Sequence, residues 1–196
     1  MVLEHDFWQR GYLVAGVDEA GRGALAGPIV VAAVVLRPGD HPYRDSKKLT
    51  PRQREALLSH LLKNALFWAV ASASAGEVDR LGVLKATHQA AYSALRRLRK
   101  QPNAVITDYL FLDLNLPLLA PPKAEDVSPS VAAASILAKV VRDRHMMGLH
   151  QTYPQYNFAA NKGYGTAEHL SLLSRLGPCP VHRRRFAPVA QAKLWD

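Results

Sequence analysis

Three acidic residues stand where an apolar segment gives way to a turn, which is an unusual place for a charge. Asp18 and Glu19 end one apolar segment just before a glycine-rich stretch, and Asp108 follows Ala104–Thr107. Charged side chains are rarely buried unless they are paired or bound to a metal. Carboxylates that converge at strand ends repel one another. A hard divalent cation such as Mg²⁺ or Mn²⁺ relieves that repulsion, because it prefers oxygen ligands.

Two divalent ions held in this way are suited to phosphodiester hydrolysis. One ion activates a water molecule and the other stabilises the leaving oxygen, with the ions about 3.5–4 Å apart. The alternative is that Asp18 and Asp108 only cap turns, as aspartate often does. We favour the metal interpretation for the pair, because the net charge of +9 suits a polyanionic partner, nucleic acid above all.

The composition also bears on the binding partner and on the cellular compartment. Two dense basic clusters, Arg96–Lys100 and Arg183–Arg185, strengthen the case for a nucleic-acid partner. A single cysteine, Cys179, allows neither an internal disulfide nor a thiolate metal cage, so we expect a reducing compartment, the cytoplasm. No signal peptide is recognisable, and the longest apolar run, Ile29–Leu36, is too short to cross a bilayer.

Strands must bring the acids together. Tyr12–Glu19 and Ile29–Leu36 are predicted strands, and the link between them contains three glycines and a proline, which favours an antiparallel hairpin. Phe67–Ser74 and Ala104–Thr107 are two further predicted strands. Tyr109–Pro129 is predicted to be irregular because it is rich in proline.

Cap residues mark the predicted helices. Thr50 and Ser128 each precede a proline at the first helical position, and Thr166 opens a segment that stops at Gly177. Tyr153–Gly165 is predicted to be a loop. The predicted helices run from Pro51 to about Lys63, Val78 to about Leu98, Pro129 to about Leu149, and Thr166 to Gly177. This order of elements indicates one α/β or α+β domain around a mixed sheet.

Four ordered sequence blocks are more specific than any single acidic pair. The first is Gly16–Pro28, which reads Gly-Val-Asp-Glu-Ala-Gly-Arg-Gly-Ala-Leu-Ala-Gly-Pro. The others are Asp45–Leu49, Ala132–Arg144, and Lys162–Thr166 followed by His182–Pro188. Together these blocks resemble the ribonuclease HII family over nearly the whole chain.

The resemblance implies both a fold and an activity. The fold would be a ribonuclease H-like α/β domain, with a five-stranded mixed sheet flanked by helices and a helical extension over about residues 150–196 that contributes to substrate binding. The enzyme would be a monomeric endonuclease that cuts the RNA strand of RNA–DNA hybrids. It would also cut 5′ of single ribonucleotides embedded in a DNA duplex, as in ribonucleotide excision repair, leaving a 5′-phosphate and a 3′-hydroxyl with Mg²⁺ or Mn²⁺.

The resemblance assigns metal binding and catalysis to Asp18, Glu19 and Asp108. The fourth carboxylate is either Glu125 or Asp126. Residue type favours Asp126, because the family has aspartate here. Register favours Glu125, because counting back from the serine of the alanine-rich block then needs no gap. We prefer Glu125.

The resemblance also assigns substrate reading to Gly21, Arg22, Gly23 and Tyr164. The glycine-arginine-glycine motif would read the 2′-hydroxyl, which distinguishes RNA from DNA, and glycine allows a backbone to approach a sugar closely. The tyrosine would stack on the sugar of the following deoxynucleotide. The alternatives are an ordinary hairpin turn and a loop aromatic that packs on the core.

Several polar and basic residues are candidate phosphate contacts. Lys139 and Arg142 share one helical face, so both could grip one backbone; the alternative is a solvated basic face. His182 is interpreted as a core or capping residue, and Met146 and Met147 as core. The candidate phosphate contacts are Ser46, Lys47, Lys139, Arg142 and the run Arg183, Arg184 and Arg185.

The sequence departs from the family pattern at two further positions. Ala24 stands where proline is usual, which predicts a small loss of rigidity, and Tyr109 stands where glycine is usual, so the loop after Asp108 could run differently. Two alternatives stay open. One is a ribonuclease of the HIII type, which usually carries an additional N-terminal domain. The other is a catalytically inactive module that binds hybrids, against which the intact acids argue.

Overall fold

The computed structural model describes residues 2–43 and 49–192. Ser46 and Lys47, two of the predicted phosphate contacts, lie outside the described residues. Five strands form one mixed sheet in the order β3-β2-β1-β4-β5, which confirms the predicted architecture. The strands are β1 (Val14–Ala20), β2 (Ile29–Val35), β3 (Phe67–Ala73), β4 (Ala104–Thr107) and β5 (Leu118–Leu119).

The sheet topology places the ends of β1 and β4 side by side. β1 and β2 pair antiparallel, with Ala20 opposite Val30, so the predicted hairpin is confirmed. β2 and β3 also pair antiparallel, whereas β4 runs parallel to β1 and β5 runs parallel to β4. Two parallel neighbours end at the same edge of a sheet, and the residues that follow them therefore meet there.

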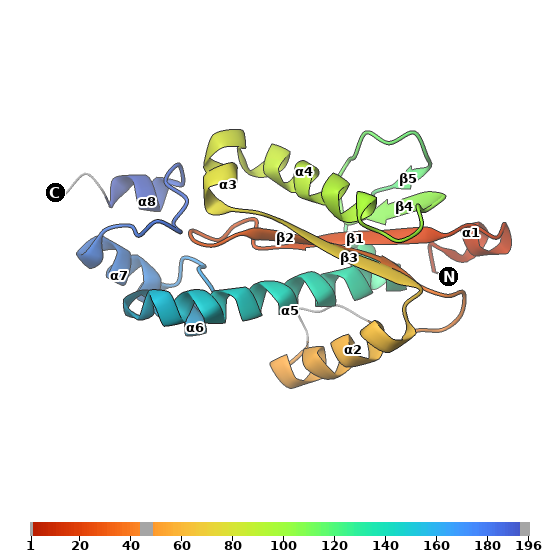
Figure 1. Ribbon diagram of the computed structural model, residues 1–196, viewed down its shortest axis with the longest axis horizontal. Helices are drawn as coiled ribbons and strands as arrows, with labels where there is room; N and C mark the ends of the chain where they lie inside the picture. Colours follow the sequence, from red (N-terminus) through yellow and green to blue (C-terminus); the bar gives the residue numbers. More distant parts are fainter. Residues whose placement is uncertain (1, 44–48, 193–196) are drawn as a thin grey trace.

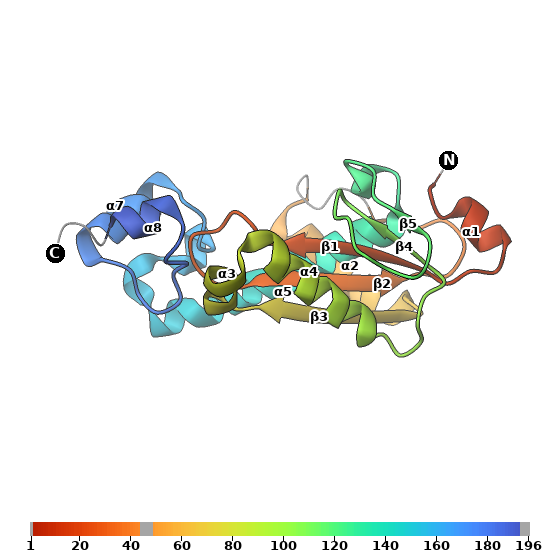
Figure 2. The same cartoon turned by 90° about the horizontal axis from the view of Figure 1, so that it is seen from above.

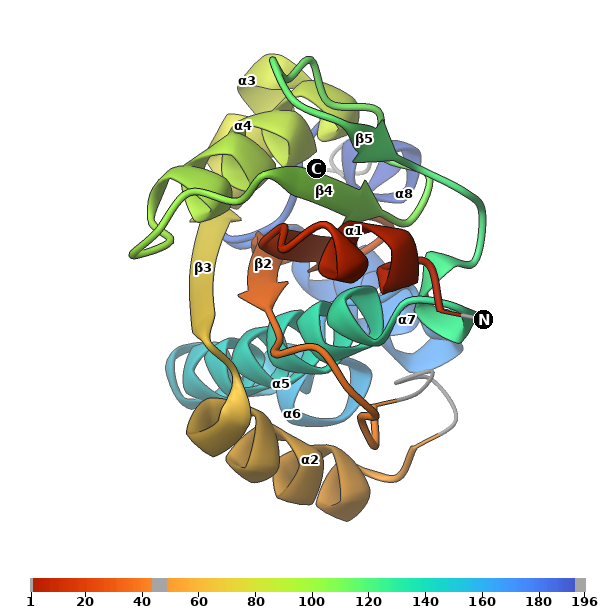
Figure 3. The same ribbon diagram turned by 90° about the vertical axis from the view of Figure 1, so that its right-hand side faces the viewer.

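Helices cover both faces of the sheet, as Figures 1 and 3 show. α3 (Ala75–Leu81) and α4 (Val83–Arg96) lie on one face, and α2 (Pro51–Asn64) and α5 (Pro129–Thr152) lie on the other. Successive strand residues point to opposite faces, so the valine- and alanine-rich strands feed one apolar core under α3 and α4 and a second under α5 and α2.

α5 packs unusually close to β1. A Cβ atom added at Gly16 would lie 2.1 Å from the carbonyl carbon of Ser130, so only glycine permits this contact. The predicted cap is confirmed, since the Ser128 side chain accepts a hydrogen bond from the Val131 backbone at 3.2 Å. The close approach brings side chains of α5 directly beneath the end of β1.

Three of the predicted elements are wrong, and one is Tyr109–Pro129, which was expected to be irregular but contains β5 and the 3₁₀ turn η2 (Ala124–Asp126). A single helix from Val78 to Leu98 was expected, but Gly82, with φ +82°, separates α3 from α4. Both flanking segments favour helix, and the break lies at the one residue suited to a positive φ. Tyr153–Gly165 is not a plain loop either, because it contains the 3₁₀ turn η3 (Pro154–Tyr156) and the short helix α6 (Phe158–Asn161).

The last helices gather at one end of the molecule (Figures 1 and 2). α7 (Ala167–Leu176) begins at the predicted Thr166 cap and ends at Gly177, and α8 (Ala187–Gln191) follows. α1 (His5–Gln9) lies at the opposite end of the molecule. Among the described residues, no helix has the length and apolar character needed to cross a membrane.

Candidate active site

The ends of β1 and β4 bring Asp18 and Asp108 together. Val17 pairs with Thr107 in the parallel register, so each aspartate is the residue that directly follows this pair: Asp18 within β1 and Asp108 just after β4. Burial is the main cause that raises the pKa of Asp18 to about 8, and the charges of Glu19 and Asp108 raise it further. A hydrogen bond from Ser135 of α5 opposes this shift. Asp18 is therefore a carboxyl group whose surroundings do not compensate a negative charge.

A fourth acid approaches from the short 3₁₀ turn η2 (Ala124–Asp126). The Ala124 backbone N–H donates to Asp108 Oδ1 at 3.2 Å. The pKa of Asp108 is raised, chiefly by burial and also by the charge of Glu125 and a hydrogen bond with it. Glu125 is buried and Asp126 is exposed. The structure thus brings Glu125, and not Asp126, to the other acids; we call Asp18, Glu19, Asp108 and Glu125 the carboxylate cluster.

The N-terminal segment, which the sequence patterns did not single out, braces this cluster. Glu4 is fully buried, and its Oε1 accepts from Ser128 Oγ at 2.6 Å and from the Ser130 backbone at 3.0 Å. The Leu3 backbone also donates to the Val127 carbonyl at 3.0 Å. Glu4 therefore ties residues 124–130 to the body of the protein, and a negative charge at the start of a helix is favourable. The predicted helix start at Ser128-Pro129 was the only sequence feature that could have pointed to an acidic partner, because a helix N-terminus favours a nearby negative charge.

The carboxylate cluster supplies oxygen atoms, the type of ligand that a divalent cation such as Mg²⁺ prefers. Mg²⁺ and Mn²⁺ take oxygen ligands, and Mg²⁺ usually combines one or two carboxylates with waters and substrate phosphate. Within residues 2–43 and 49–192, no three acidic, histidine or cysteine side chains lie close enough together to hold a metal ion by themselves. An open arrangement of carboxylates that repel one another suits ions completed by water and phosphate. Glu19 is also paired with Arg22, whose Nη1 lies 3.2 Å from Glu19 Oε1.

Two buried arginines hold the link between β1 and β2, residues 21–28, which we call the glycine turn. Arg183 donates to the carbonyls of Gly21 at 2.7 Å, Arg22 at 2.8 Å and Gly27 at 3.0 Å. Arg142 donates to the carbonyls of Pro28 at 3.0 Å and Ala26 at 3.2 Å.

These contacts correct the prediction that Arg142 and Arg183 touch phosphates. Both side chains are fully buried, and their guanidinium groups face backbone carbonyls of the protein itself. From sequence, an arginine on a helix face or in a basic run resembles a solvent-exposed charge. Arg184 matches that expectation, because it is exposed.

The glycines of the turn differ in what they allow. Gly21 has φ +94°, and a Cβ there would lie 2.0 Å from Arg142 Nε, so this position has no room for a side chain. A Cβ at Gly23 would meet nothing within 4 Å, which leaves open space beside the turn. Ala24 donates its N–H to the Gly21 carbonyl at 3.3 Å, a bond that proline could not make. The expected loss of rigidity at Ala24 is therefore offset.

Tyr164 lies over the same face of α5. Its ring centroid is 5.0 Å from the Arg142 guanidinium carbon and 5.6 Å from Lys139 Nζ. The ring is half-exposed, and Lys139, which pairs with Asp143 at 2.8 Å, is half-exposed as well. The structure thus brings Tyr164 and Lys139 together beside the glycine turn, with the ring accessible.

A core of histidines supports the Tyr164 loop. His169 Nδ1 lies 2.9 Å from the Tyr164 carbonyl oxygen, and His169 Nε2 lies 3.1 Å from His182 Nε2. The Cys179 backbone donates to His182 Nδ1 at 3.0 Å. The structural interpretation of His182 is confirmed. Met146 is buried as predicted, but Met147 is 47% exposed, so the prediction of a core residue was wrong there.

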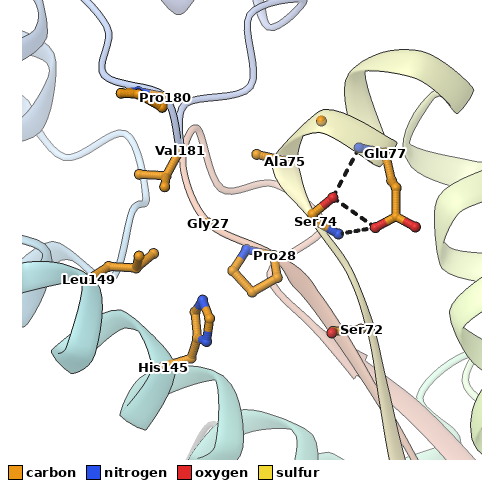
Figure 4. Close-up of a pocket in the computed structure, with 11 residues that line it drawn as sticks. Gly27, Pro28, Ser72, Ser74, Ala75, Glu77, His145, Leu149, Pro180 and Val181 are labelled. Atoms are coloured by element: carbon orange, nitrogen blue, oxygen red, sulfur yellow. Dashed lines mark hydrogen bonds between the residues drawn. The ribbon is translucent and has the colours of Figure 1, made fainter. Parts of the chain in front are cut away.

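Two pockets in the described part of the surface differ in whether a member of the carboxylate cluster lines them. One pocket of about 270 Å³ is lined by Pro28, Ser74, His145 and Val181 among others, and no member of the carboxylate cluster lines it (Figure 4). Another, of about 400 Å³, includes Glu125 in its wall.

Carboxylates at the ends of adjacent parallel strands, in a five-stranded mixed sheet with helices on both faces, define a hydrolase of the ribonuclease H-like class. The family model described as Ribonuclease HII matches residues 15–189. The chain belongs to the ribonuclease HII family. It is accordingly a ribonuclease H, an endonuclease that acts on RNA–DNA hybrids.

Individual relatives agree with this assignment. Ribonuclease HII of Thermus thermophilus is 62% identical over 192 residues, which span 98% of this chain and 95% of that one. The crystal structure of ribonuclease H2 from Pyrococcus horikoshii OT3 has a TM-score of 0.79 at 28% identity and covers 92% of this chain and 97% of its own. The structure of Bst-RNase HIII in complex with Mn²⁺ shares the fold, with a TM-score of 0.70 at 21% identity, covering 93% and 69% of the two chains.

Proposed function

We propose that this ribonuclease H cuts with two divalent ions, Mg²⁺ or Mn²⁺, held by Asp18, Glu19, Asp108 and Glu125. The observation that carries the proposal is the carboxylate cluster itself. Burial and the neighbouring acids raise the pKa of Asp18 and of Asp108, which means that their ionised forms are disfavoured. A bound cation would favour the ionised forms. The Mn²⁺ complex of a ribonuclease HIII with the same fold is consistent with this choice of ion.

When bound, the ions would activate a water molecule and stabilise the leaving oxygen, giving a 5′-phosphate and a 3′-hydroxyl. The protein's own residues would hold the carboxyl groups and orient them. Ser135 holds the Asp18 carboxyl group, and the Ala124 N–H holds Asp108 Oδ1. Because these contacts fix the carboxylates before substrate arrives, the chain positions the reacting groups without a large rearrangement.

We also propose that the glycine turn and Tyr164 read a ribonucleotide embedded in DNA, with cleavage on its 5′ side. Arg183 fixes the carbonyls of Gly21 and Arg22, and the open space beside Gly23 allows a sugar and its 2′-hydroxyl to approach the backbone. The accessible ring of Tyr164 is suited to stacking on the next sugar. Lys139 and Arg184 remain candidate phosphate contacts, since neither is fully buried.

The composition also supports a proposal for the oligomeric state, the compartment and the substrate. We infer a monomeric cytoplasmic enzyme, formed by one catalytic domain whose residues from about 150 onward add to substrate binding. The chain has one cysteine, and Cys179 is buried, which suits a reducing compartment. The net charge of +9 suits a nucleic-acid duplex with or without an embedded ribonucleotide.

The test is cleavage of a DNA duplex that carries one ribonucleotide, with the products mapped to the nucleotide. The unaltered protein with Mg²⁺ should cut on the 5′ side of the ribonucleotide. Asp18→Asn should lose cleavage and keep duplex binding, because one carboxylate is lost while the basic surface remains. Asp113→Asn is the matched control, since Asp113 is an exposed aspartate outside the cluster. Substantial Mg²⁺-dependent cleavage by Asp18→Asn would contradict the proposal, and binding without any cleavage by the unaltered protein would favour an inactive hybrid-binding module.

A further inference from the structure

Tyr109 and Phe111 are the most exposed of the large apolar side chains in the described part of the chain, at 63% and 61%. Their rings meet edge to face, with centroids 5.3 Å apart. They follow Asp108 of the carboxylate cluster by one and three residues. Two aromatic rings are thus presented to solvent at the rim of the candidate active site.

The segment that carries these rings is anchored. Thr107 Oγ1 donates to the Leu110 carbonyl at 2.7 Å and accepts from the Leu110 N–H at 3.3 Å. Leu110 and Leu112 are buried, so the alternate residues, Tyr109 and Phe111, point outward. The rings therefore project from a fixed support and not from a loose loop.

Folding alone gives no reason for a tyrosine at position 109. Its φ is +51°, in the left-handed region that favours glycine, and its ring is mostly exposed. Glycine would occupy this backbone without strain, and the core would lose nothing by the change. A large ring held in this conformation and facing solvent indicates contact with something outside the chain.

The contacts of α5 show on which side of the cluster the pair lies. Ser135 bonds to Asp18, and Arg142, seven residues further along, contacts Tyr164. At a rise of about 1.5 Å per residue, that is roughly 10 Å along the helix axis. Asp108 is bonded instead to Ala124, which precedes the start of α5. The Tyr109 N–H donates to the Pro121 carbonyl at 3.3 Å, so this segment begins beside residues that precede α5, whereas Tyr164 lies beside Arg142 further along that helix.

We propose that Tyr109 and Phe111 pack against the substrate strand on the side of the cut away from Tyr164, the 5′ side of the ribonucleotide. This inference rests on the proposed function, in which Tyr164 takes the nucleotide that follows the ribonucleotide. Aromatic rings stack on bases and sugars with little regard to sequence. The pair therefore adds affinity for the upstream strand without reading its bases.

Tyr109→Gly tests the inference, with affinity measured by fluorescence anisotropy in EDTA on a labelled duplex carrying one ribonucleotide. The variant should bind roughly fivefold to tenfold more weakly, in the range of one lost stacking contact. The dependence of affinity on salt should not change, because no charge is removed. The variant should unfold no more easily than the unaltered protein, since glycine suits φ +51°.

Substrate length and a control variant make the test specific. Shortening the upstream flank should weaken the unaltered protein and bring its affinity to that of Tyr109→Gly, whereas shortening the downstream flank should weaken both equally. Trp68→Ala is the control, because Trp68 is 44% exposed on β3, at the far edge of the sheet from β4. This variant should bind like the unaltered protein.

The outcomes separate this inference from the proposed function. If the unaltered protein cleaves at the ribonucleotide and Tyr109→Gly binds the long duplex equally well, the aromatic contact is refuted and the function stands. If the unaltered protein does not cleave with Mg²⁺, the proposed function fails first. If Tyr109→Gly changes only self-association, measured by sedimentation, the pair serves a second copy of the chain and the inference is overturned.

Discussion

Two groups of like charges in this protein are compensated in different ways. The carboxylate cluster gathers acids at the ends of β1 and β4, and Arg142 and Arg183 gather positive charges behind the glycine turn. The guanidinium groups meet backbone carbonyls, with Arg183 bonded to Gly21, Arg22 and Gly27. The acids also accept hydrogen bonds, Asp18 from Ser135 and Asp108 from Ala124, but each lies beside another negative charge.

The pKa shifts express this difference. Burial, followed by the charge of Arg142, lowers the pKa of Arg183 to about 10, so the arginine still carries its charge at neutral pH. Burial, followed by the charge of Glu19, raises the pKa of Asp18 to about 8, so the carboxyl group resists ionisation until a cation arrives. A buried charge supports the fold even beside a like charge when its donors meet carbonyls, as all three guanidinium nitrogens of Arg183 do. A buried carboxyl group beside other carboxyl groups is disfavoured in its ionised form, so binding of a cation stabilises it.

Removing an acid should therefore cost activity and spare the fold. Glu125→Gln should lower Mg²⁺-dependent cleavage by roughly two orders of magnitude or more, as loss of a ligand or its supporting group does. Its thermal stability in EDTA should stay equal or rise, because one repulsion on Asp108 is relieved. Asp126→Asn, a change in the adjacent exposed acid, should cost little. The reverse ranking of the two variants in matched assays would exclude Glu125 from the cluster.

Removing a buried arginine should have the opposite effect. Arg183→Ala leaves three carbonyls of the glycine turn without their donor, which should lower the free energy of unfolding by about 3 kcal/mol. Arg184→Ala removes an exposed neighbour and should change it by about 0.5 kcal/mol or less. Urea denaturation of both variants measures the difference. A stable Arg183→Ala with normal unfolding but weak duplex binding would restore the phosphate role and break the comparison.

The buried histidines should make the C-terminal part of the fold sensitive to acid. Burial, followed by His169, lowers the pKa of His182 from 6.5 to about 4. Between these values the unfolded chain binds more protons than the folded one. The free energy of unfolding therefore falls as pH drops from about 6.5 to 4, and the contribution of His182 to it is fully present above pH 6.5. The loss should be about 3.5 kcal/mol, from a shift of about 2.5 pKa units at about 1.4 kcal/mol each. His182→Gln should flatten this part of the curve of unfolding free energy against pH, and an unchanged slope would show that another group dominates.

Local patterns in the sequence predicted the elements that carry the cluster. Apolar runs bounded by turn residues indicated β1, β2 and β4, and the caps Thr50, Ser128 and Thr166 marked where three helices begin. These features depend on neighbours within a few residues, so they can be read along the chain. For the same reason the sequence indicated Asp18 and Asp108, since each is an acid at the end of an apolar run.

The tertiary structure decided what each charge does. Arg142 and Arg183 look like phosphate contacts in the sequence, and only the fold places the carbonyls of residues 21–28 against them. Glu125 and Asp126 are adjacent acids, and only the turn at η2 buries one beside Asp108 and exposes the other. The role of a charge depends on its burial and on partners distant in sequence, which local patterns do not contain.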